Sequence, residues 1–285
     1  MESVVVKAYA KINLFLEVCE KRIDNYHNID SVMHTVSLHD IITVTKSDKI
    51  ELSNNIGLPN DASNLAYKGA LKFFEYFSIN SGCKIHIEKN IPVSAGLAGG
   101  STDAAAVLKA LNELYDIGAS VDTLCEIGAK LGADVPFCIK GGCCITKGTG
   151  DIMTPCQTLP ECYIVVSKMG EGVSTPYAYG QIDELRSNTP HTPLTSDTVV
   201  SALKQKDLNH LCKYFYNAFE QVVIPIRPLV SEQKEIMLKN GAVASMMSGS
   251  GPSVFGIYTN KDSAETTADV LRSMGAQAYV CTSYT

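Results

Sequence analysis

The stretch that most constrains this chain runs from Ile91 to Asp103, where three glycines fall within five residues. The residues just before it, 83–88, alternate between apolar and polar side chains, which predicts a strand. The residues just after it, 104–114, carry apolar side chains at helical spacing, which predicts a helix with Ser101, Thr102 or Asp103 as its N-cap. The sequence therefore places a glycine loop between a strand and a helix.

This loop has the physical features of a phosphate-binding site. Glycines let backbone N–H groups approach an anion, and a helix that begins beside them adds unpaired donors and the positive end of its dipole. The loop lacks the lysine of a P-loop, and the spacing of Gly96, Gly99 and Gly100 does not match the dinucleotide-binding fingerprint. Taken alone, it fits a phosphate cradle and a glycine-rich turn before a core helix equally well.

Composition and charge argue against several classes of protein. With 285 residues, 45% of them apolar and 19% charged, the chain is long enough for one large core or two moderate ones. Its net charge of −6 argues against general binding to nucleic acid or acidic membranes. No apolar run reaches the length of a membrane span, residues 1–7 lack the features of a signal peptide, and the ten cysteines form no Cys-x-x-Cys pair. These features predict a cytoplasmic protein with reduced thiols and neither a membrane nor a nucleic-acid partner.

The remaining pattern predicts two units, the second beginning near residues 155–160. In the first unit, strands are expected at 4–18, 31–38 and 40–45, and helices at 64–77 and after Ser120. In the second, the expected strands are 162–167, 241–247, 253–258 and 276–282, and the expected helices are 197–222, 226–239 and 261–274. The alternation of strands and helices in the second unit predicts a split βαβ sandwich.

Asp134 and Lys11 are charged residues in apolar surroundings. A buried carboxylate must be paired or must titrate abnormally, so Asp134 is either a helix or turn cap or a general base kept ionised by a cation such as Lys11. Lys11 and Asn13 have the same strand parity, so their side chains face one side. From these residues alone, a solvated strand face is the simpler interpretation of Lys11.

Two further features have both a structural and a functional interpretation. Tyr26 and His27 follow a polar turn, where they either close a loop or stack on a flat ligand. The glycine-rich turn at residues 249–251 follows a predicted strand, where a hairpin is the commoner interpretation than a binding site.

Several motifs in order resemble those of one family. Lys7–Leu14, Pro92–Ala105 and Met247–Pro252 are similar to the three motifs of the GHMP kinase superfamily. Further matching stretches lie at 21–27, 37–40, 64–68 and 132–137, so the resemblance covers nearly the whole chain. The double glycine of Gly-Leu-Ala-Gly-Gly-Ser-Thr-Asp-Ala-Ala resembles the superfamily members whose acceptor alcohol carries a cytidine diphosphate, and differs from the usual mevalonate-type loop.

The resemblance implies an α+β protein with the two-domain GHMP kinase fold. A ribosomal-S5-like domain is expected over residues 1–155 and a ferredoxin-like domain over 156–285, with ATP between them. The implied activity is an ATP-dependent phosphorylation of the 2-hydroxyl of a cytidine diphosphate conjugate, in the non-mevalonate pathway to isoprenoid precursors.

The resemblance also implies roles for individual residues. Asp134 corresponds to the catalytic acid residue that takes the proton of the acceptor hydroxyl, and Lys11 to a lysine beside both. The residues expected to bind ATP are Asn64, Leu65, Pro92, Val93, Ser94, Ala95, Gly96, Leu97, Ala98, Gly99, Gly100, Ser101 and Thr102. The residues expected to bind the second substrate are Asn13, Tyr26, His27, Thr175, Tyr177, Gly249 and Ser250, with Tyr26 and Tyr177 on the two faces of the cytosine.

Some details depart from the family or stay open. Asn25 stands where the family usually has glycine, Asn28 where glutamate is common, and Thr102 where a second serine is usual. No acidic side chain is an obvious Mg²⁺ ligand, so the ion is expected to be held mainly through ATP and water. The alternatives are a GHMP kinase for a mevalonate-, homoserine- or sugar-type alcohol, and a nucleotide-binding regulator without catalysis. The sequence fits a monomer and a homodimer equally.

Overall fold

The computed structural model describes residues 2–189 and 191–284, which divide into two compact units. The first unit comprises residues 2–10, 39–93 and 98–141, and the second comprises residues 11–38, 94–97 and 142–284. The units are discontinuous because the two longest strands, β1 (Ser3–Lys21) and β2 (His27–Ser47), each contribute residues to both. The domain boundary expected near residue 155 stays a prediction.

Strand β2 is longer than the sequence predicts. Two strands were expected here, over residues 31–38 and 40–45, but one strand runs through His39 without a break. Asp40 is fully buried, and its Oδ1 accepts the backbone N–H groups of Asn90 and Ile91 at 2.6 and 2.7 Å. The carboxylate is therefore part of the interior and does not mark a turn.

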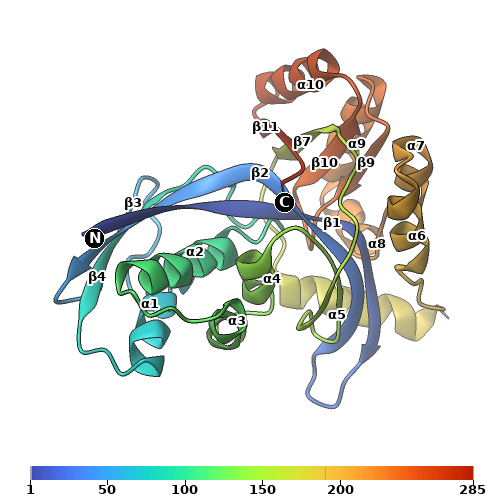
Figure 1. Ribbon diagram of the computed structural model, residues 1–285. Helices are drawn as coiled ribbons and strands as arrows, with labels where there is room; N and C mark the ends of the chain where they lie inside the picture. The colour runs from blue at the N-terminus through green and yellow to red at the C-terminus, as the bar shows by residue number, and fades with distance from the viewer. Residues whose placement is uncertain (1, 190, 285) are drawn as a thin grey trace. The chain divides into compact units, whose positions relative to one another are not determined.

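In the first unit, four helices pack beside a small set of strands (Figure 1). Strand β4 (Gly82–Glu88) pairs antiparallel with residues 41–47 of β2, and β3 (Glu51–Asn54) pairs parallel with β4. The helices are α1 (Leu65–Tyr76), α2 (Gly99–Leu114), α3 (Val121–Ala129) and α4 (Val135–Lys140). The apolar faces of α1 and α2 meet in a core that includes Phe73 and Leu108, so the predicted helical stripes are confirmed.

Helix α2 begins inside the glycine stretch, so the expected N-cap was wrong. Its N-cap is Ala98, which has a left-handed backbone (φ 58°) and makes no side-chain cap. Thr102 and Asp103 lie in the first turns of the helix and bond elsewhere: Thr102 Oγ1 donates to the Tyr9 carbonyl at 2.8 Å, and Asp103 accepts from Lys89. The predicted cap of α3 is confirmed, since the Ser120 side chain accepts the N–H of Thr123.

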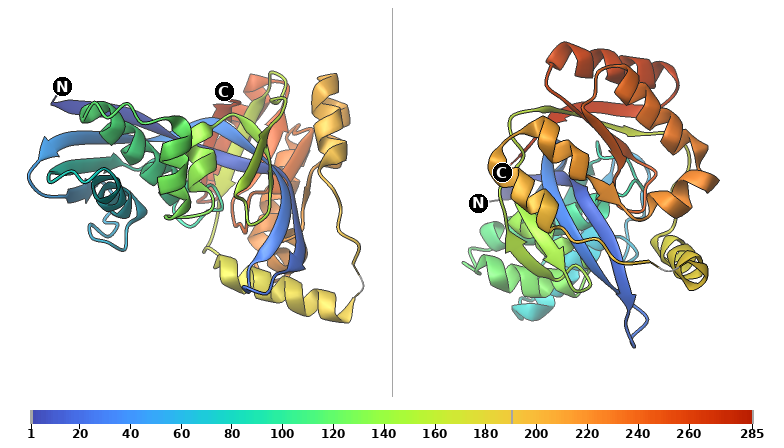
Figure 2. Two further views of the ribbon diagram at one scale, coloured as in Figure 1. Left: turned by 60° about the horizontal axis from the view of Figure 1, so that its bottom comes forward. Right: turned by 90° about the vertical axis from the view of Figure 1, so that its right-hand side faces the viewer.

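The second unit contains a four-stranded antiparallel sheet in the order β11-β7-β10-β9. Its strands are β7 (Tyr163–Lys168), β9 (Ala244–Met247), β10 (Val254–Tyr258) and β11 (Gln277–Thr282). Helices α9 (Pro228–Lys239) and α10 (Lys261–Ser273) lie beside each other and pack on it (Figure 2). This strand order confirms the predicted split βαβ, ferredoxin-like arrangement.

The other elements of the second unit surround the two long strands. The hairpin of β5 (Cys143–Lys147) and β6 (Ile152–Pro155) pairs with residues 31–34 of β2. Helix α5 (Thr175–Asn188) lies beside the turn that joins β1 and β2 (Figure 2).

The prediction of a single helix over residues 197–222 was wrong. The segment consists of α6 (Asp197–Gln205), α7 (Leu208–Leu211), η1 (Cys212–Tyr214), β8 (Tyr216–Asn217) and α8 (Glu220–Val223), followed by η2 (Ile224–Ile226). Lys206 ends α6 with a left-handed backbone, and the Asp207 side chain caps α7. Strand β8 then pairs parallel with β1 at Phe15, which no helical periodicity signals.

All ten cysteines are free thiols, in agreement with the reduced thiols that the sequence predicts. Within the two described stretches of chain, no helix combines the length and the apolar character needed to cross a membrane.

Candidate functional site

The glycine loop has an unusual backbone. Ser94, Gly96 and Ala98 all have positive φ angles, of 51°, 72° and 58°. Alternation of right- and left-handed residues turns successive backbone N–H groups toward one point, which is how an anion-binding nest forms. Two of the three residues are not glycine, and a left-handed backbone costs such residues about 1 kcal/mol or more. This backbone favours the phosphate cradle over an ordinary turn.

The three glycines of the loop differ in how much space a side chain would have at each position. A Cβ on Gly96 would lie 2.1 Å from the Ser248 carbonyl oxygen, so no side chain fits there. A Cβ on Gly99 would lie 3.0 Å from Lys89 Nζ. A Cβ on Gly100 would meet only Leu65 Cδ1, at 3.6 Å, and Gly100 is exposed. The fold therefore requires glycine at position 96 but not at position 100.

In the first unit, a buried group of charges joins the two ends of the loop. Lys89 Nζ donates to Asp40 Oδ2 at 2.5 Å and to Asp103 Oδ2 at 2.7 Å, and all three side chains are at most 4% exposed. Lys89 comes just before the loop and Asp103 just after it. The group fixes the strand end and the helix start relative to each other.

The charge of this group is not balanced when both carboxylates are ionised. Burial raises the pKa of Asp103 to about 7, the Lys89 cation opposes this rise, and the Asp40 carboxylate adds to it. Asp103 Oδ1 is buried without a hydrogen-bond partner. A carboxyl group that is partly protonated near neutral pH accounts for that isolated oxygen. From the sequence, Asp103 was expected only as a possible cap, and this role was missed.

The other predicted nucleotide residues of the first unit have clear local positions. The Asn64 side chain caps α1 by accepting the N–H of Ala66 at 2.9 Å, and its amide donates to the Pro59 carbonyl. Leu65 begins α1 and lies next to Gly100. Pro92 is buried, whereas Val93 is exposed. Asn64 is thus a helix cap, and ATP binding by Asn64 and Leu65 stays a prediction.

Asp134 lies at the N-cap position of α4, but its side chain makes no capping hydrogen bond. The structural interpretation of this residue as a cap is therefore wrong, and its half-buried carboxylate is not used to end the helix. Asp134 belongs to the first unit and Lys11 to the second. Their pairing stays a prediction.

In the second unit, Lys11 is 4% exposed and belongs to a polar network. Its Nζ donates to Asn13 Oδ1 at 2.7 Å, and the Asn13 amide donates to Ser31 Oγ at 2.9 Å. The backbone N–H of Lys11 donates to the Leu97 carbonyl at 3.2 Å. Lys11 is therefore not on a solvated face, and it lies against the glycine loop.

The turn at 248–251 meets the same network. The N–H of Gly249 donates to Asn13 Oδ1 at 3.1 Å, and Ser248 Oγ donates to the Gly96 carbonyl at 3.0 Å. Ser250 Oγ lies 3.1 Å from Thr175 Oγ1, at the start of α5. Within the second unit, the structure thus brings Lys11, Asn13, Gly96, Gly249, Ser250 and Thr175 together. The turn joins the antiparallel strands β9 and β10, so the predicted hairpin is confirmed, and these contacts are additional to it.

Of the predicted base-binding residues, Tyr26 and His27 lie at the hairpin of β1 and β2, and Tyr177 lies in the first turn of α5. His27 Nε2 lies 2.7 Å from Asp183 Oδ1, and the ring stacks on Tyr179 at 4.8 Å between centroids. Tyr26 and Tyr177 are 66% and 47% exposed, so both present open aromatic faces. Sequence reasoning missed Tyr179 and Asp183. Their spacing of four residues on one helix face, opposite a histidine, was the available signal.

No group of three or more His, Cys, Asp or Glu side chains suited to a metal ion occurs within residues 2–189 and 191–284. The Asp40–Lys89–Asp103 group already holds a cation of its own, the Lys89 ammonium.

Comparison with known proteins identifies relatives of this chain. Residues 64–142 match the model of the GHMP kinases N terminal domain, and residues 199–277 match that of the GHMP kinases C terminal domain. A 4-diphosphocytidyl-2-C-methyl-D-erythritol kinase from Clostridium perfringens is 42% identical over 270 residues, which cover 94% of this chain and 93% of that protein. One from Exiguobacterium sibiricum is 40% identical and covers 98% and 97%.

Solved structures agree in fold. A crystal structure of 4-(cytidine 5'-diphospho)-2C-methyl-D-erythritol kinase has a TM-score of 0.82 at 32% identity, with 98% of each chain covered. A homoserine kinase from Cytophaga hutchinsonii has a TM-score of 0.72 at 19% identity, and covers 100% of this chain and 95% of that one. The second likeness concerns the fold alone.

Proposed function

Because this chain belongs to the GHMP kinase family, we propose that it transfers the γ-phosphoryl group of ATP to the 2-hydroxyl of 4-diphosphocytidyl-2-C-methyl-D-erythritol. The relatives that carry this substrate in their names are 40–42% identical to the chain over nearly its full length. The structural observation that carries the proposal is the contact of Lys11 and the Gly249 turn with the glycine loop, through Leu97, Asn13 and Gly96. A phosphate loop, a buried cation and a second glycine turn thus share one network.

In this proposal the glycine loop holds the phosphates by backbone N–H groups. The left-handed residues from Ser94 to Ala98 and the first turn of α2 supply donors that need no rearrangement on binding. Phosphoryl transfer needs mainly positioning and neutralisation of charge, so the missing P-loop lysine is no obstacle.

Asp134 and Lys11 carry the proton chemistry. Asp134 takes the proton of the 2-hydroxyl, which its freedom from a capping role permits. Lys11 stabilises the developing negative charge on that oxygen, and Asn13 holds its ammonium in place. Both roles are proposals that rest on the family resemblance and on the local geometry of each residue.

The cytidine end of the substrate is proposed to bind at the hairpin beside α5. Tyr26 and Tyr177 offer exposed rings, and His27 offers its second ring nitrogen. Because Asp183 holds Nε2, the neutral ring carries its proton there, and Nδ1 is left as an acceptor for the exocyclic amino group of cytosine. Uracil has a carbonyl at that position and would be disfavoured.

Mg²⁺ is proposed to enter with ATP and to neutralise phosphate charge when bound. Mg²⁺ prefers oxygen ligands and keeps several waters, and the phosphates of ATP supply such oxygens. The net charge of −6 supports a small-molecule enzyme without nucleic-acid or acidic-membrane partners, and we propose that it acts in the cytoplasm.

The test is ADP release by the purified protein with Mg-ATP and a panel of alcohols. The panel contains 4-diphosphocytidyl-2-C-methyl-D-erythritol, its uridine analogue, mevalonate, homoserine and galactose. The proposal expects turnover with the cytidine compound and at least tenfold lower kcat/KM with the others. Turnover with mevalonate or homoserine instead would reject the substrate and keep the kinase activity. No turnover with any of them would favour a nucleotide-binding regulator.

A further inference from the structure

The turn that carries Gly249 is held from the side opposite Asn13 by residues with no role assigned so far. The amide of Asn217, which is 3% exposed, donates to the carbonyl of Met247 at 2.7 Å and to that of Gly249 at 2.9 Å. Its Oδ1 accepts the N–H of Phe219 at 3.0 Å, which fixes the orientation of the amide. One buried side chain thus makes three hydrogen bonds, two of them to the turn.

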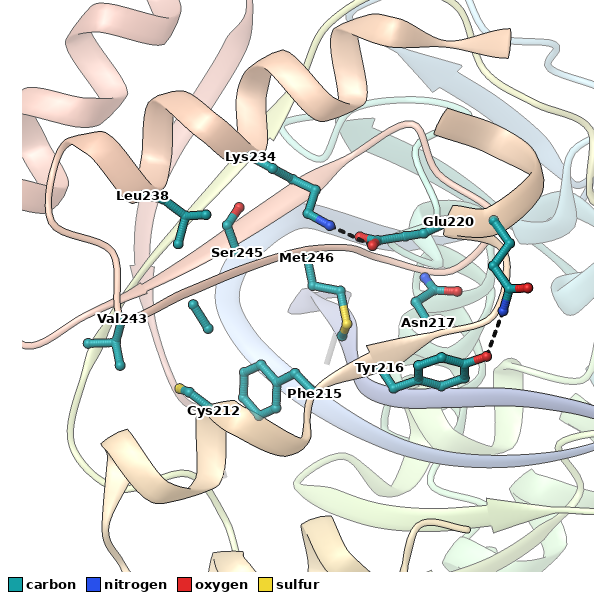
Figure 3. A pocket seen from close by; sticks show the side chains of 12 residues that line it. Cys212, Phe215, Tyr216, Asn217, Glu220, Lys234, Leu238, Val243, Ser245 and Met246 are labelled. Atoms are coloured by element: carbon teal, nitrogen blue, oxygen red, sulfur yellow. Dashed lines mark hydrogen bonds and ion pairs between the residues drawn. The ribbon is translucent and has the colours of Figure 1, made fainter. Parts of the chain in front are cut away.

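Glu220 holds the preceding peptide of the same turn. Its Oε1 accepts the N–H of Met247 at 2.8 Å, and its Oε2 pairs with Lys234 Nζ at 2.5 Å. Asn217 of β8, Glu220 of α8 and Lys234 of α9 line a cavity of about 350 Å³, and the Glu220–Lys234 pair is drawn in Figure 3. The cavity leaves room for a changed side chain at Glu220, so substitution there does not force repacking.

Both backbone polar groups of Gly249, the N–H and the carbonyl, therefore form hydrogen bonds. Its N–H bonds to Asn13, which also holds Lys11, and its carbonyl bonds to Asn217. A movement of the turn would remove one of the two bonds that Asn13 Oδ1 accepts, and would leave Lys11 less firmly placed. The connection from Asn217 to Lys11 passes through only two residues, Gly249 and Asn13.

We infer that Asn217 is a positioning residue for phosphoryl transfer, which fixes the Gly249 turn and through Asn13 the ammonium of Lys11, with Glu220 and Lys234 as its support. The inference rests on the proposed kinase activity for its kinetic consequence. It adds a specific claim to that proposal, namely that a residue distant in sequence from all three family motifs controls the rate of the chemical step.

The decisive variant is Asn217→Asp, which keeps the shape and removes the donor to both carbonyls. We expect kcat to fall at least tenfold, with KM for ATP and for the acceptor within about threefold of wild type. The matched control is Gln221→Glu, at an exposed amide that donates only to the Tyr216 hydroxyl, and its kcat should be unchanged. A folded Asn217→Asp protein with wild-type kcat would overturn the inference, whatever its melting temperature.

If Asn217→Asp does not fold, a pair of variants at Glu220 decides the question. Glu220→Gln and Glu220→Leu both remove the charge that pairs with Lys234, but only Gln keeps an acceptor for the Met247 N–H. We expect kcat within about twofold of wild type for Gln and at least fivefold lower for Leu. Equal kcat values for the two variants would overturn the inference.

Amide hydrogen exchange separates this inference from the proposed function. In Asn217→Asp, or in Glu220→Leu as its substitute, exchange across residues 247–251 should be at least tenfold faster than in Gln221→Glu. If the wild-type protein transfers no phosphate, the kinase proposal fails, and this exchange still tests whether Asn217 and Glu220 fix the turn at residues 247–251. If the wild type is active and the variant exchanges its amide hydrogens no faster than the control, only the positioning role of Asn217 is rejected.

Discussion

Lys89 and Asp103 form a buried ion pair, with 2.7 Å between Nζ and Oδ2, that joins the residue before the glycine loop to the helix after it. Asp40 accepts from the same ammonium and also binds the backbone of Asn90 and Ile91. The loop therefore has a rigid base in the first unit. Three charges buried together with a net charge of −1 are costly unless one carboxyl group takes up a proton.

This ion pair makes stability depend on pH in a direction that can be stated. Burial raises the folded-state pKa of Asp103 from its ordinary value of 3.8 to about 7. The folded protein therefore binds more protons than the unfolded chain between these values, and the stability contributed by this group is lost as pH rises through about 7. The asparagine side chain of the Asp103→Asn variant does not titrate. The melting temperature of this variant minus that of wild type should therefore increase as pH rises from 5 to 8.

The measurement is thermal unfolding of both proteins across that range. For a chain of this size, each kcal/mol corresponds to about 2–4 °C. Asp48→Asn, at an exposed aspartate in the same unit, controls for the loss of one carboxylate. A difference between Asp103→Asn and wild type that stays constant from pH 5 to pH 8 would show that Asp103 does not titrate there.

Two glycines of the loop should respond differently to alanine. Gly96→Ala places Cβ 2.1 Å from the Ser248 carbonyl and requires a left-handed alanine, so we expect a loss of stability of about 2–4 kcal/mol. Gly100→Ala meets only ordinary contact with Leu65 and should fold normally. If phosphates lie over the exposed start of α2, Gly100→Ala should weaken ATP binding at least tenfold. Wild-type ATP affinity in Gly100→Ala would place the phosphates elsewhere.

Asp183 should control the affinity for the cytidine substrate. Asp183→Asn removes the anion that holds His27 Nε2 and Lys21 Nζ, each at 2.7 Å. We expect KM for the cytidine substrate to rise about tenfold while KM for ATP stays unchanged, because a charged hydrogen bond contributes about 1.5–3 kcal/mol. Glu184→Gln, at the next and more exposed carboxylate, is the matched control. Equal increases in both variants would mean that general charge, and not the His27 contact, is responsible.

Asp134→Asn tests the proposed base. The variant should lose about 10²- to 10⁴-fold in kcat, which is the usual contribution of a general base, and it should retain ATP binding by calorimetry. Since the Asp134 side chain makes no capping bond, its melting temperature should stay close to that of wild type. Full turnover in this variant would remove Asp134 from the mechanism.

The sequence predicted those parts of the structure that depend on local periodicity. The helices after Asn64 and Ser120 and the strands and helix from Ala244 to Thr282 follow alternation or helical spacing, and all were found. The error at 197–222 arose because β8 is set by pairing with β1, a contact between residues about 200 positions apart. Local periodicity contains no information about such pairing.

The candidate site shows the same limit. Glycine positions and motif order predicted the loop and the turn at 249–251, but the residues that hold them were missed. Asp40, Lys89 and Asp103 are ordinary charged residues in sequence, and their role depends on being buried together. Asp183 and Asn217 likewise act through partners 30 or more positions away.

The most direct test of the account is the identity of the reaction product. The purified protein is incubated with Mg-ATP and 4-diphosphocytidyl-2-C-methyl-D-erythritol, and the mixture is followed by ³¹P NMR. One new phosphomonoester signal on the 2-hydroxyl is expected, equal in amount to the ADP formed, with the diphosphate bridge intact. ADP and inorganic phosphate without a phosphomonoester, or a phosphate at another hydroxyl, would contradict it.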